Sequence, residues 1–375
     1  MISPKTFYTW LGESQVDFFS GVPDSLLKDI CAYITDNAPK KNHIIAANEG
    51  NSIALAAGYH MATNKIPLVY MQNSGIGNAI NPLLSLTDKQ VYNIPLLLMI
   101  GWRGEPGKKD EPQHVKQGEV TLGLLDAMNI PYLVISEDEQ KASEQIKLAI
   151  AQIKETNEPF AIVIKKGTFE KYSLKESIKN NYELSREDSI KQIVNQLHGD
   201  EIIVSTTGKT SRELFECRAS LKQAHNSDFL TVGCMGHASQ IALGIALNKP
   251  NKKVICIDGD GALLMHMGGL AITGSMAPNN FTHIVINNGA HESVGGQPTV
   301  GFDIDVPTLA KANNYKFATS VTNAKELEQA LQNITEDSCP SLIEIKVSIG
   351  SRDDLGRPTI KPVDNKLDFM KNLKS

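Results

Sequence analysis

The sequence predicts an α/β protein built from two doubly wound, parallel-sheet domains. Short apolar runs alternate with helix-like stretches from residue 7 to residue 164, and the same rhythm returns after residue 200. Such alternation is typical of repeated βα units around a parallel sheet. A polar stretch with no apolar period separates the two halves. We therefore expect two domains of similar size joined by a short linker.

The first half contains five apolar runs that we expect to form strands, the first of them a buried strand. They are residues 43–47, 66–71, 95–100, 132–136 and 160–164. The segment that follows, KKGTFEKYSLKESIKNNYELSR, is charged and has the composition of a surface linker. We place the first domain at residues 1–168 and the linker at residues 169–186.

The second half repeats the pattern, and we place the second domain at residues 187–375. Its expected strands are residues 201–205, 229–232, 253–258, 282–287 and 341–347. Helix-like segments such as SQIALGIALN and AKELEQALQNI lie between them.

Composition excludes several classes of protein. The formal charge of -5 gives no basic field that would attract nucleic acid or an acidic membrane face. The most apolar run, residues 94–102, is far short of the roughly 20 residues needed to cross a bilayer. The five cysteines are odd in number and widely spaced, which favours reduced thiols over a disulfide framework. We expect a soluble, cytoplasmic protein that binds neither nucleic acid nor membrane.

The segment KVICIDGDGALL predicts an anion site in the second domain. Residues 254–257 form a strand, Gly259 and Gly261 permit a tight turn, and a helix begins at about Ala262. The first N–H groups of that helix favour a phosphate, and the Asp260 carboxylate supplies an oxygen for Mg²⁺ against the phosphate.

A second metal ligand is expected from the next strand, residues 283–286. A right-handed crossover would place this strand beside the first, with Asn287 and Asn288 about 5 Å from Asp260 along the same edge of the sheet. A carboxylate and an amide oxygen then converge, as Mg²⁺ requires.

Neither GDGALL nor GIGNAI has the third glycine of a dinucleotide fingerprint. TTGKT, residues 206–210, lacks the P-loop glycine because Ile203 stands there.

GDG followed by NNG between two strands resembles the thiamine diphosphate motif of the decarboxylase and acetolactate synthase family. The resemblance implies Asp260, Asn288 and the backbone carbonyl of Ala290 as Mg²⁺ ligands. The interval between Asp260 and Asn288 is one residue longer than expected, so Asn287 remains the alternative ligand. The two domains would then be a pyrimidine-binding domain followed by a diphosphate-binding domain, without the middle domain usual in the family.

NEGNSIALAAGY, residues 48–59, resembles the family's activating-glutamate segment, which places Glu49 at the start of an Ala-rich helix. A carboxyl group must bond the pyrimidine ring so that the cofactor's own amino group can remove the proton from thiazolium C2. We expect burial to keep a proton available on Glu49. Because the cofactor of this family lies between domains of different subunits, the resemblance implies at least a homodimer.

Other segments match the same family. Residues 71–83 resemble its serine–glycine loop beside the pyrimidine ring, which includes Ser74. By similarity Gly208, Lys209 and Thr210 would touch the diphosphate, and Met235 would support the bent cofactor.

Among members without a middle domain, those that decarboxylate phosphonopyruvate or sulfopyruvate are most similar, through residues 20–30, 101–114 and 205–214. Members that act on sulfopyruvate usually consist of two separate subunits, each with one of these halves. A single chain that contains both halves therefore favours 3-phosphonopyruvate, a small anionic 2-oxo acid, with CO₂ and phosphonoacetaldehyde as products. Sulfopyruvate decarboxylation and an acetolactate-type carboligation remain alternatives, and a non-catalytic binding module is a more distant one.

An anionic substrate needs cationic donors. The expected donors lie in predicted loops near the sheet edges: Arg103, Lys109, Arg212 and His291. Lys108 has the same position but is more simply a surface charge. Asp24 and His114 match positions where related decarboxylases keep proton-transfer residues.

Overall fold

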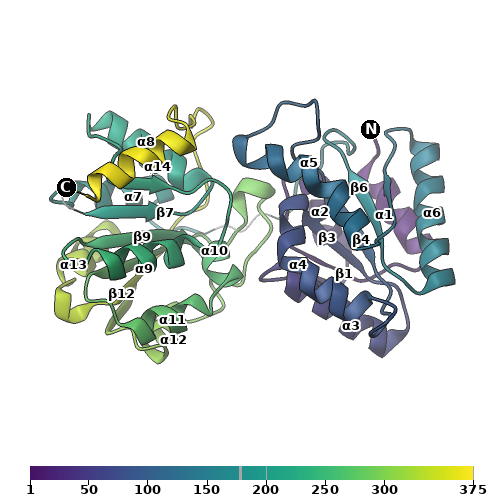
Figure 1. Ribbon diagram of the computed structural model, residues 1–375, viewed down its shortest axis with the longest axis horizontal. Coiled ribbons are helices and arrows are strands. Elements are labelled where there is room, and N and C mark those ends of the chain that lie inside the picture. The colour runs from purple at the N-terminus through teal and green to yellow at the C-terminus, as the bar shows by residue number, and fades with distance from the viewer. Residues whose placement is uncertain (177–179, 200, 375) are drawn as a thin grey trace. The chain divides into compact units, whose positions relative to one another are not determined.

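The computed structural model describes residues 1–176, 180–199 and 201–374. The chain divides into two compact units (Figure 1). Unit 1 consists of Met1–Ser177 with Ser293–Gln297, and unit 2 of Ile178–Glu292 with Pro298–Ser375.

Unit 1 contains a six-stranded, fully parallel sheet in the order β2-β1-β3-β4-β6-β5. Its strands are β1 Phe19–Gly21, β2 His43–Ile45, β3 Leu68–Gln72, β4 Leu97–Gly101, β5 Tyr132–Val134 and β6 Phe160–Ile164. The five expected strands are present. Strand β1, which pairs with both β2 and β3, was not expected from the sequence.

Helices cover both faces of this sheet, as a doubly wound fold requires. The longer ones are α1 Pro4–Glu13, α2 Lys28–Asn37, α3 Glu49–Thr63, α4 Ile76–Pro82, α5 Pro112–Ala127 and α6 Glu139–Thr156. Leu68 and Tyr70 of β3 join the core formed with α1, α2 and α6, whereas Val69 and Met71 join the core formed with α3, α4 and α5. Burial on both faces explains why the strands are nearly continuous apolar runs.

Unit 2 contains a second six-stranded parallel sheet in the order β11-β12-β10-β9-β7-β8. Its strands are β7 Ile202–Ser205, β8 Asp228–Leu230, β9 Val254–Gly259, β10 Phe281–Asn287, β11 Phe317–Val321 and β12 Ser341–Lys346. The edge strand β11 was not expected from the sequence. The α/β class, with two such sheets and no third between them, is confirmed for the described residues.

The helices of unit 2 also pack on both faces of their sheet (Figure 1). They are α7 Arg186–Asn195, α8 Lys209–Ser220, α9 Ala238–Asn248, α10 Asp260–Met265, α11 Gly269–Met276, α12 Val306–Ala312, α13 Ala324–Gln332 and α14 Pro362–Asn372. One core contains α7, α8 and α13, and the other contains α9 to α12 and α14. No helix among the described residues is long and apolar enough to span a membrane.

Candidate functional site

The expected metal and phosphate residues lie at the carboxyl edge of the unit 2 sheet. Strands β10, β9 and β7 are neighbours there, so the loops that follow them meet at one edge. Strand β9 runs through Gly259 directly into α10, which begins at Asp260, two residues earlier than expected. Asp260 therefore lies in the first turn of the helix, with Gly261 and the buried Ala262 after it.

Asp260 is a buried carboxylate. Its Oδ2 accepts a hydrogen bond from the Thr299 hydroxyl, and a Cβ on Gly301 would lie 2.8 Å from the same oxygen. Burial raises the pKa of Asp260 to about 6, although the bonds from Thr299 and from backbone N–H groups act in the opposite direction. Such a carboxylate lacks compensating positive charge, which a divalent cation would supply.

The two adjacent asparagines have different surroundings. Asn287 is fully buried and donates to the carbonyl of Gly301 at 2.7 Å and to Glu344 Oε1 at 2.7 Å, while its Oδ1 accepts from the N–H of Gly289. Asn288 donates through Nδ2 to Glu292 at 3.0 Å. Its Oδ1 accepts one bond, from the N–H of Ala290 at 3.0 Å. The Asn287 carboxamide is therefore used in packing the loop onto β12.

The turn after β7 has the backbone expected of an anion-binding loop. Gly208 has φ +92°, in the region that favours glycine, and it precedes α8, whose first residues are Lys209 and the buried Thr210. The Lys209 ammonium is already bonded at 2.7 Å to Glu292 Oε1 and at 2.7 Å to the Ser351 hydroxyl. What α8 offers to a phosphate is therefore its first backbone N–H groups.

Glu292 was not singled out in the sequence. Its carboxylate accepts from Lys209, from Asn288 and, at 2.9 Å, from Arg186. Burial alone would raise the pKa of Glu292, but the two cations outweigh it and the pKa is lowered. Its two cationic partners, Arg186 and Lys209, are 106 and 83 residues away in the chain, so no local sequence signal marks it.

The remaining residues expected in unit 2 lie as follows. A Cβ on Gly261 would lie 3.1 Å from the ring of His291, so this ring covers the start of α10. Burial lowers the pKa of His291 to about 4, which makes it a neutral hydrogen-bonding group at neutral pH rather than the expected cation. Arg212 donates to the carbonyls of Leu355 and Gly356, a contact that holds the segment before α14.

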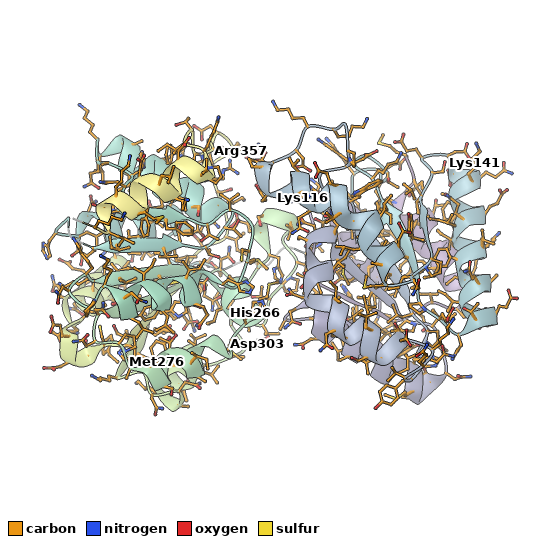
Figure 2. The ribbon with its side chains drawn as sticks, viewed as in Figure 1. Lys116, Lys141, His266, Met276, Asp303 and Arg357 are labelled. Carbon is orange, nitrogen blue, oxygen red and sulfur yellow. The ribbon has the colours of Figure 1, made fainter. Side chains whose placement is uncertain are left out.

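Met235 is half-buried in a loop with an unusual backbone. Its neighbours Cys234 and Gly236 have positive φ values of 55° and 83°. A Cβ on Gly236 would lie 2.7 Å from the ring of His266, labelled in Figure 2, so the loop is closely packed there. Cys234 is exposed, unlike the other four cysteines, all of which are buried.

Glu49 is the first residue of α3 and is buried. Asn48 caps this helix by accepting from the N–H of Asn51 at 2.9 Å. Asn78 of α4 donates to Glu49 Oε2 at 2.8 Å. A Cβ on Gly75 would lie 2.3 Å from Oε1, so a glycine is required for the carboxyl to occupy this place. Ser74, in the same turn, is exposed and accepts from Gln72.

Asp24 follows β1 and is fully buried. Its Oδ2 accepts from the N–H of Leu26 at 2.9 Å, whereas Oδ1 has no hydrogen-bond partner in the described structure. Burial raises the pKa of Asp24 to about 6 despite the attraction of Arg103. The Arg103 guanidinium pairs with both carboxylate oxygens of Asp110 and donates to Ser25 at 2.6 Å. Its charge is therefore largely balanced.

His114 is the third residue of α5 and is buried. Burial, with Arg103 nearby, lowers its pKa to about 4, so it is neutral at neutral pH. Its Nδ1 lacks a hydrogen-bond partner in the part of the chain that the structure describes. Lys108 and Lys109, in the loop before α5, are exposed.

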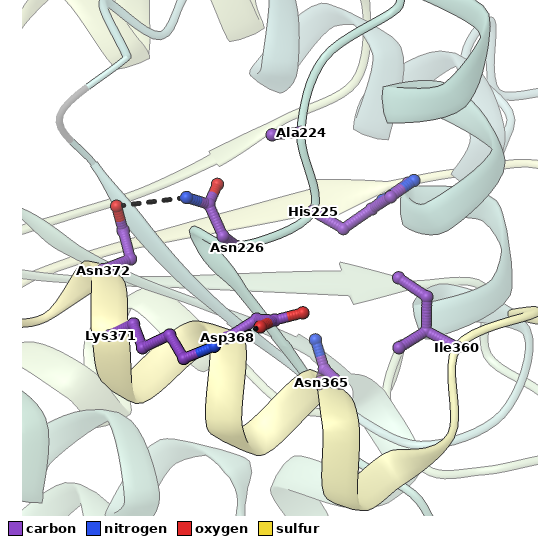
Figure 3. Close-up of a pocket in the computed structure, with 8 residues that line it drawn as sticks. All are labelled: Ala224, His225, Asn226, Ile360, Asn365, Asp368, Lys371 and Asn372. Carbon is purple, nitrogen blue, oxygen red and sulfur yellow. Dashed lines mark hydrogen bonds and ion pairs between the residues drawn. The ribbon is translucent and has the colours of Figure 1, made fainter.

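Two other features do not compete with this site. Cys256, Asp258 and His283 gather on one face of β9 and β10, but sulfur and imidazole are poor ligands for Mg²⁺. The pocket in Figure 3 is lined by α14 and by residues 224–226, which precede β8. Because the strands are parallel, this pocket lies near the amino ends of the sheet, the edge opposite to Asp260.

The family models decide the assignment. Residues 5–130 match the thiamine pyrophosphate enzyme N-terminal TPP binding domain, and residues 206–345 match the C-terminal TPP binding domain. The chain belongs to the thiamine pyrophosphate enzymes.

Within these thiamine pyrophosphate enzymes, similar proteins include decarboxylases of two substrates. Phosphonopyruvate decarboxylase of Streptomyces viridochromogenes is 32% identical over 95% of this chain and 90% of its own length. Phosphonopyruvate decarboxylase of Streptomyces hygroscopicus is 30% identical over 96% and 92%. Sulfopyruvate decarboxylase of Methanosarcina acetivorans is 30% identical over 84% and 83%.

Proposed function

We propose that this thiamine pyrophosphate enzyme uses thiamine diphosphate and Mg²⁺ to decarboxylate 3-phosphonopyruvate to phosphonoacetaldehyde and CO₂. The observation that carries the substrate is the similarity to a phosphonopyruvate decarboxylase over nearly the whole of both chains. A fused chain does not distinguish the two substrates, because the Methanosarcina sulfopyruvate decarboxylase also aligns along most of this chain.

The proposed metal ligands are Asp260, Asn288 and the carbonyl of Ala290. Asn288 is favoured over Asn287 because the Asn287 carboxamide already bonds to three groups around it. Each Oδ1 accepts a single N–H and has a second lone pair, but the Asn287 Nδ2 is fixed by two acceptors and the Asn288 Nδ2 by one. The buried, uncompensated charge of Asp260 supports a divalent cation at the same place.

The cofactor residues are proposed to divide between the two units. In unit 2, the first N–H groups of α8 and α10 would bind the diphosphate, and Met235 would support the rings. In unit 1, Glu49 would bond the pyrimidine ring beside Ser74. The proposed set in unit 2 consists of Gly208, Lys209, Thr210, Met235, Gly259, Asp260, Gly261, Ala262 and Asn288. When bound, thiamine diphosphate supplies the electron sink for the electron pair that CO₂ leaves behind.

Asp24 and His114 are proposed to handle protons. A carboxyl whose pKa is about 6 can exchange a proton near neutral pH, and Oδ1 of Asp24 makes no hydrogen bond within the described structure. His114 is neutral, so it can donate or accept a hydrogen bond without adding charge.

The substrate's anionic groups are proposed to meet Arg103, Lys109, Arg212 and His291. Lys109 is the exposed charge among them. Arg103 and Arg212 are held by Asp110 and by backbone carbonyls, so they would bind as oriented donors. The neutral His291 would donate a hydrogen bond rather than a full charge.

CO₂ release from three acids tests the substrate. Purified protein with thiamine diphosphate and Mg²⁺ should release CO₂ fastest from phosphonopyruvate, more slowly from sulfopyruvate and slowest from pyruvate. Faster release from sulfopyruvate would assign the alternative substrate. Acetolactate formation from pyruvate would indicate a carboligase, and no release from any acid would leave a binding module.

We further propose a homodimer with active sites between subunits, in the cytoplasm. Exposed apolar side chains around α3, α4 and the segment after them support a subunit contact: Leu55, Met61, Leu84, Val91 and Tyr92. Four buried free thiols suit a reducing compartment. Light scattering that gave the mass of a single chain would refute the dimer.

A further inference from the structure

Four charged side chains of unit 2 form a chain of ion pairs that includes Glu292, which we call the network. Arg186 pairs with both oxygens of Glu213, each at 2.7 Å, and its remaining terminal nitrogen donates to Glu292 at 2.9 Å. Lys209 completes the network at 2.7 Å from Glu292. Two carboxylates and two cations leave it with no net charge. The network is largely buried, because these side chains are 1% to 23% exposed.

Besides Arg186 and Lys209, Glu292 has a third partner. Its Oε2 also accepts the Nδ2 hydrogen of Asn288 at 3.0 Å, whereas both bonds of Glu213 within the described structure come from Arg186. Glu292 thus bonds the residue that follows β10 and the first residue of α8, the two places where we propose that metal and diphosphate bind.

We infer that Glu292 is a positioning residue for the metal site, an inference that rests on the proposed role of Asn288. An amide that donates through Nδ2 in one direction presents Oδ1 in the opposite direction. The bond to Glu292 therefore fixes which atom of Asn288 faces the cation, and the N–H of Ala290 holds Oδ1 from the other end. Lys209 donates to Glu292 Oε1 at 2.7 Å, and Arg186 and Asn288 donate to Oε2, so both oxygens of the carboxylate are held as acceptors.

Removing the charge of Glu292 would also weaken cation binding. Replacing Glu292 by Gln would leave the network with an excess positive charge beside the proposed Mg²⁺ site. A glutamine can also turn its amide toward Asn288, where two N–H groups would oppose each other. Both effects weaken cation binding and leave the residues that contact substrate unchanged.

Glu292→Gln and Glu213→Gln form a matched pair of variants. Each removes one buried negative charge from the same arginine, so both should lower the melting temperature of the cofactor-free protein. Only Glu292→Gln releases Asn288. Changes around metal ligands typically reduce metal affinity by about 10- to 100-fold, and we expect this loss for Glu292→Gln alone.

The quantity to measure is the Mg²⁺ concentration needed for half-maximal binding of thiamine diphosphate. Calorimetry monitors the binding. Loss of the free Mn²⁺ signal in electron paramagnetic resonance checks the metal itself. Equal metal requirements for Glu292→Gln and wild type, or equal losses in both variants, would overturn the inference. If Glu292→Gln fails to fold, Glu292→Asp keeps the network neutral but is too short to reach both Lys209 and Asn288. It should still raise the metal requirement several-fold, and a wild-type requirement would overturn the inference.

Mg²⁺-dependent cofactor binding tests the role of Glu292, whereas CO₂ release tests the proposed substrate. Wild-type protein that binds thiamine diphosphate with Mg²⁺ but does not decarboxylate phosphonopyruvate would refute the substrate and leave the role of Glu292 standing. Wild-type binding that is independent of Mg²⁺ would refute both the metal site and the positioning role.

Discussion

Replacing Asp24 by Asn should remove a loss of stability that unit 1 suffers as the pH rises, and should make the enzyme slower. The Asp24 carboxyl is fully buried, and its pKa rises from 3.8 to about 6 on folding, chiefly through desolvation. The folded state therefore holds this proton more tightly than the unfolded state. Ionised Asp24 destabilises the fold at a pH above 3.8, and the cost is complete above about pH 6.

The shift sets the size of the effect. A difference of 2.2 units, from 3.8 to about 6, corresponds to a cost of about 3 kcal/mol at pH 7.5, since one unit is about 1.4 kcal/mol. At about pH 4.5 the same linkage leaves a cost of only about 1 kcal/mol. Asn also places an amide N–H₂ where Oδ1 lacks a partner, a penalty that does not change with pH. The stability of Asp24→Asn relative to wild type should therefore rise by about 2 kcal/mol between about pH 4.5 and pH 7.5.

Urea unfolding of the cofactor-free protein, followed by tryptophan fluorescence, measures this difference. Both tryptophans, Trp10 and Trp102, lie in unit 1 with Asp24, so the signal reports on that unit. Loss of a proton-transfer group should lower kcat by about 100-fold or more. If the difference in unfolding free energy between Asp24→Asn and wild type stays constant with pH, ionised Asp24 does not destabilise the fold and the claim is refuted.

Two further predictions concern the cofactor site. Asn288→Ala should raise the Mg²⁺ requirement for cofactor binding about tenfold or more, with little change in melting temperature. Asn287→Ala should instead lower the free energy of unfolding by roughly 3 kcal/mol. The opposite pattern would make Asn287 the ligand. Gly75→Ala should lower kcat about 100-fold, because its Cβ would lie 2.3 Å from Glu49 Oε1 and displace the carboxyl. Gly77→Ala, with open space at its Cβ, is the control, and equal kinetics in both variants would contradict the placement of Glu49.

Most strands and helices could be predicted from the local pattern of apolar residues. Strands β1 and β11 could not. Strand β1, Phe19–Gly21, has three residues, too few to show any period, and pairing with β2 and β3 places it in the sheet. Strand β11, Phe317–Val321, is a partly exposed edge strand that mixes apolar residues with Thr and Ser. Strand β2 was expected to be buried, but it lies at the sheet edge and is half-buried.

The site was predictable where sheet geometry alone places a residue. Asp260 and Asn288 follow strands that are neighbours in the sheet, so the crossover rule alone places both at the same sheet edge. The choice between the two asparagines needed tertiary contacts, because Asn287 is held by Glu344, 57 residues away. The same limit explains the ion pair of Lys209 with Glu292, because the two residues are 83 positions apart in the chain.

The most direct test of the account compares wild type with Glu49→Gln in one assay of CO₂ release from phosphonopyruvate and of thiamine diphosphate binding. Gln keeps the size of the side chain and a hydrogen bond from Asn78, so the variant should still bind the cofactor with Mg²⁺. It cannot share a carboxyl proton with the pyrimidine ring. We predict rapid CO₂ release by wild type and loss of most turnover in the variant. Full activity of Glu49→Gln, or no release by wild type, would contradict the account.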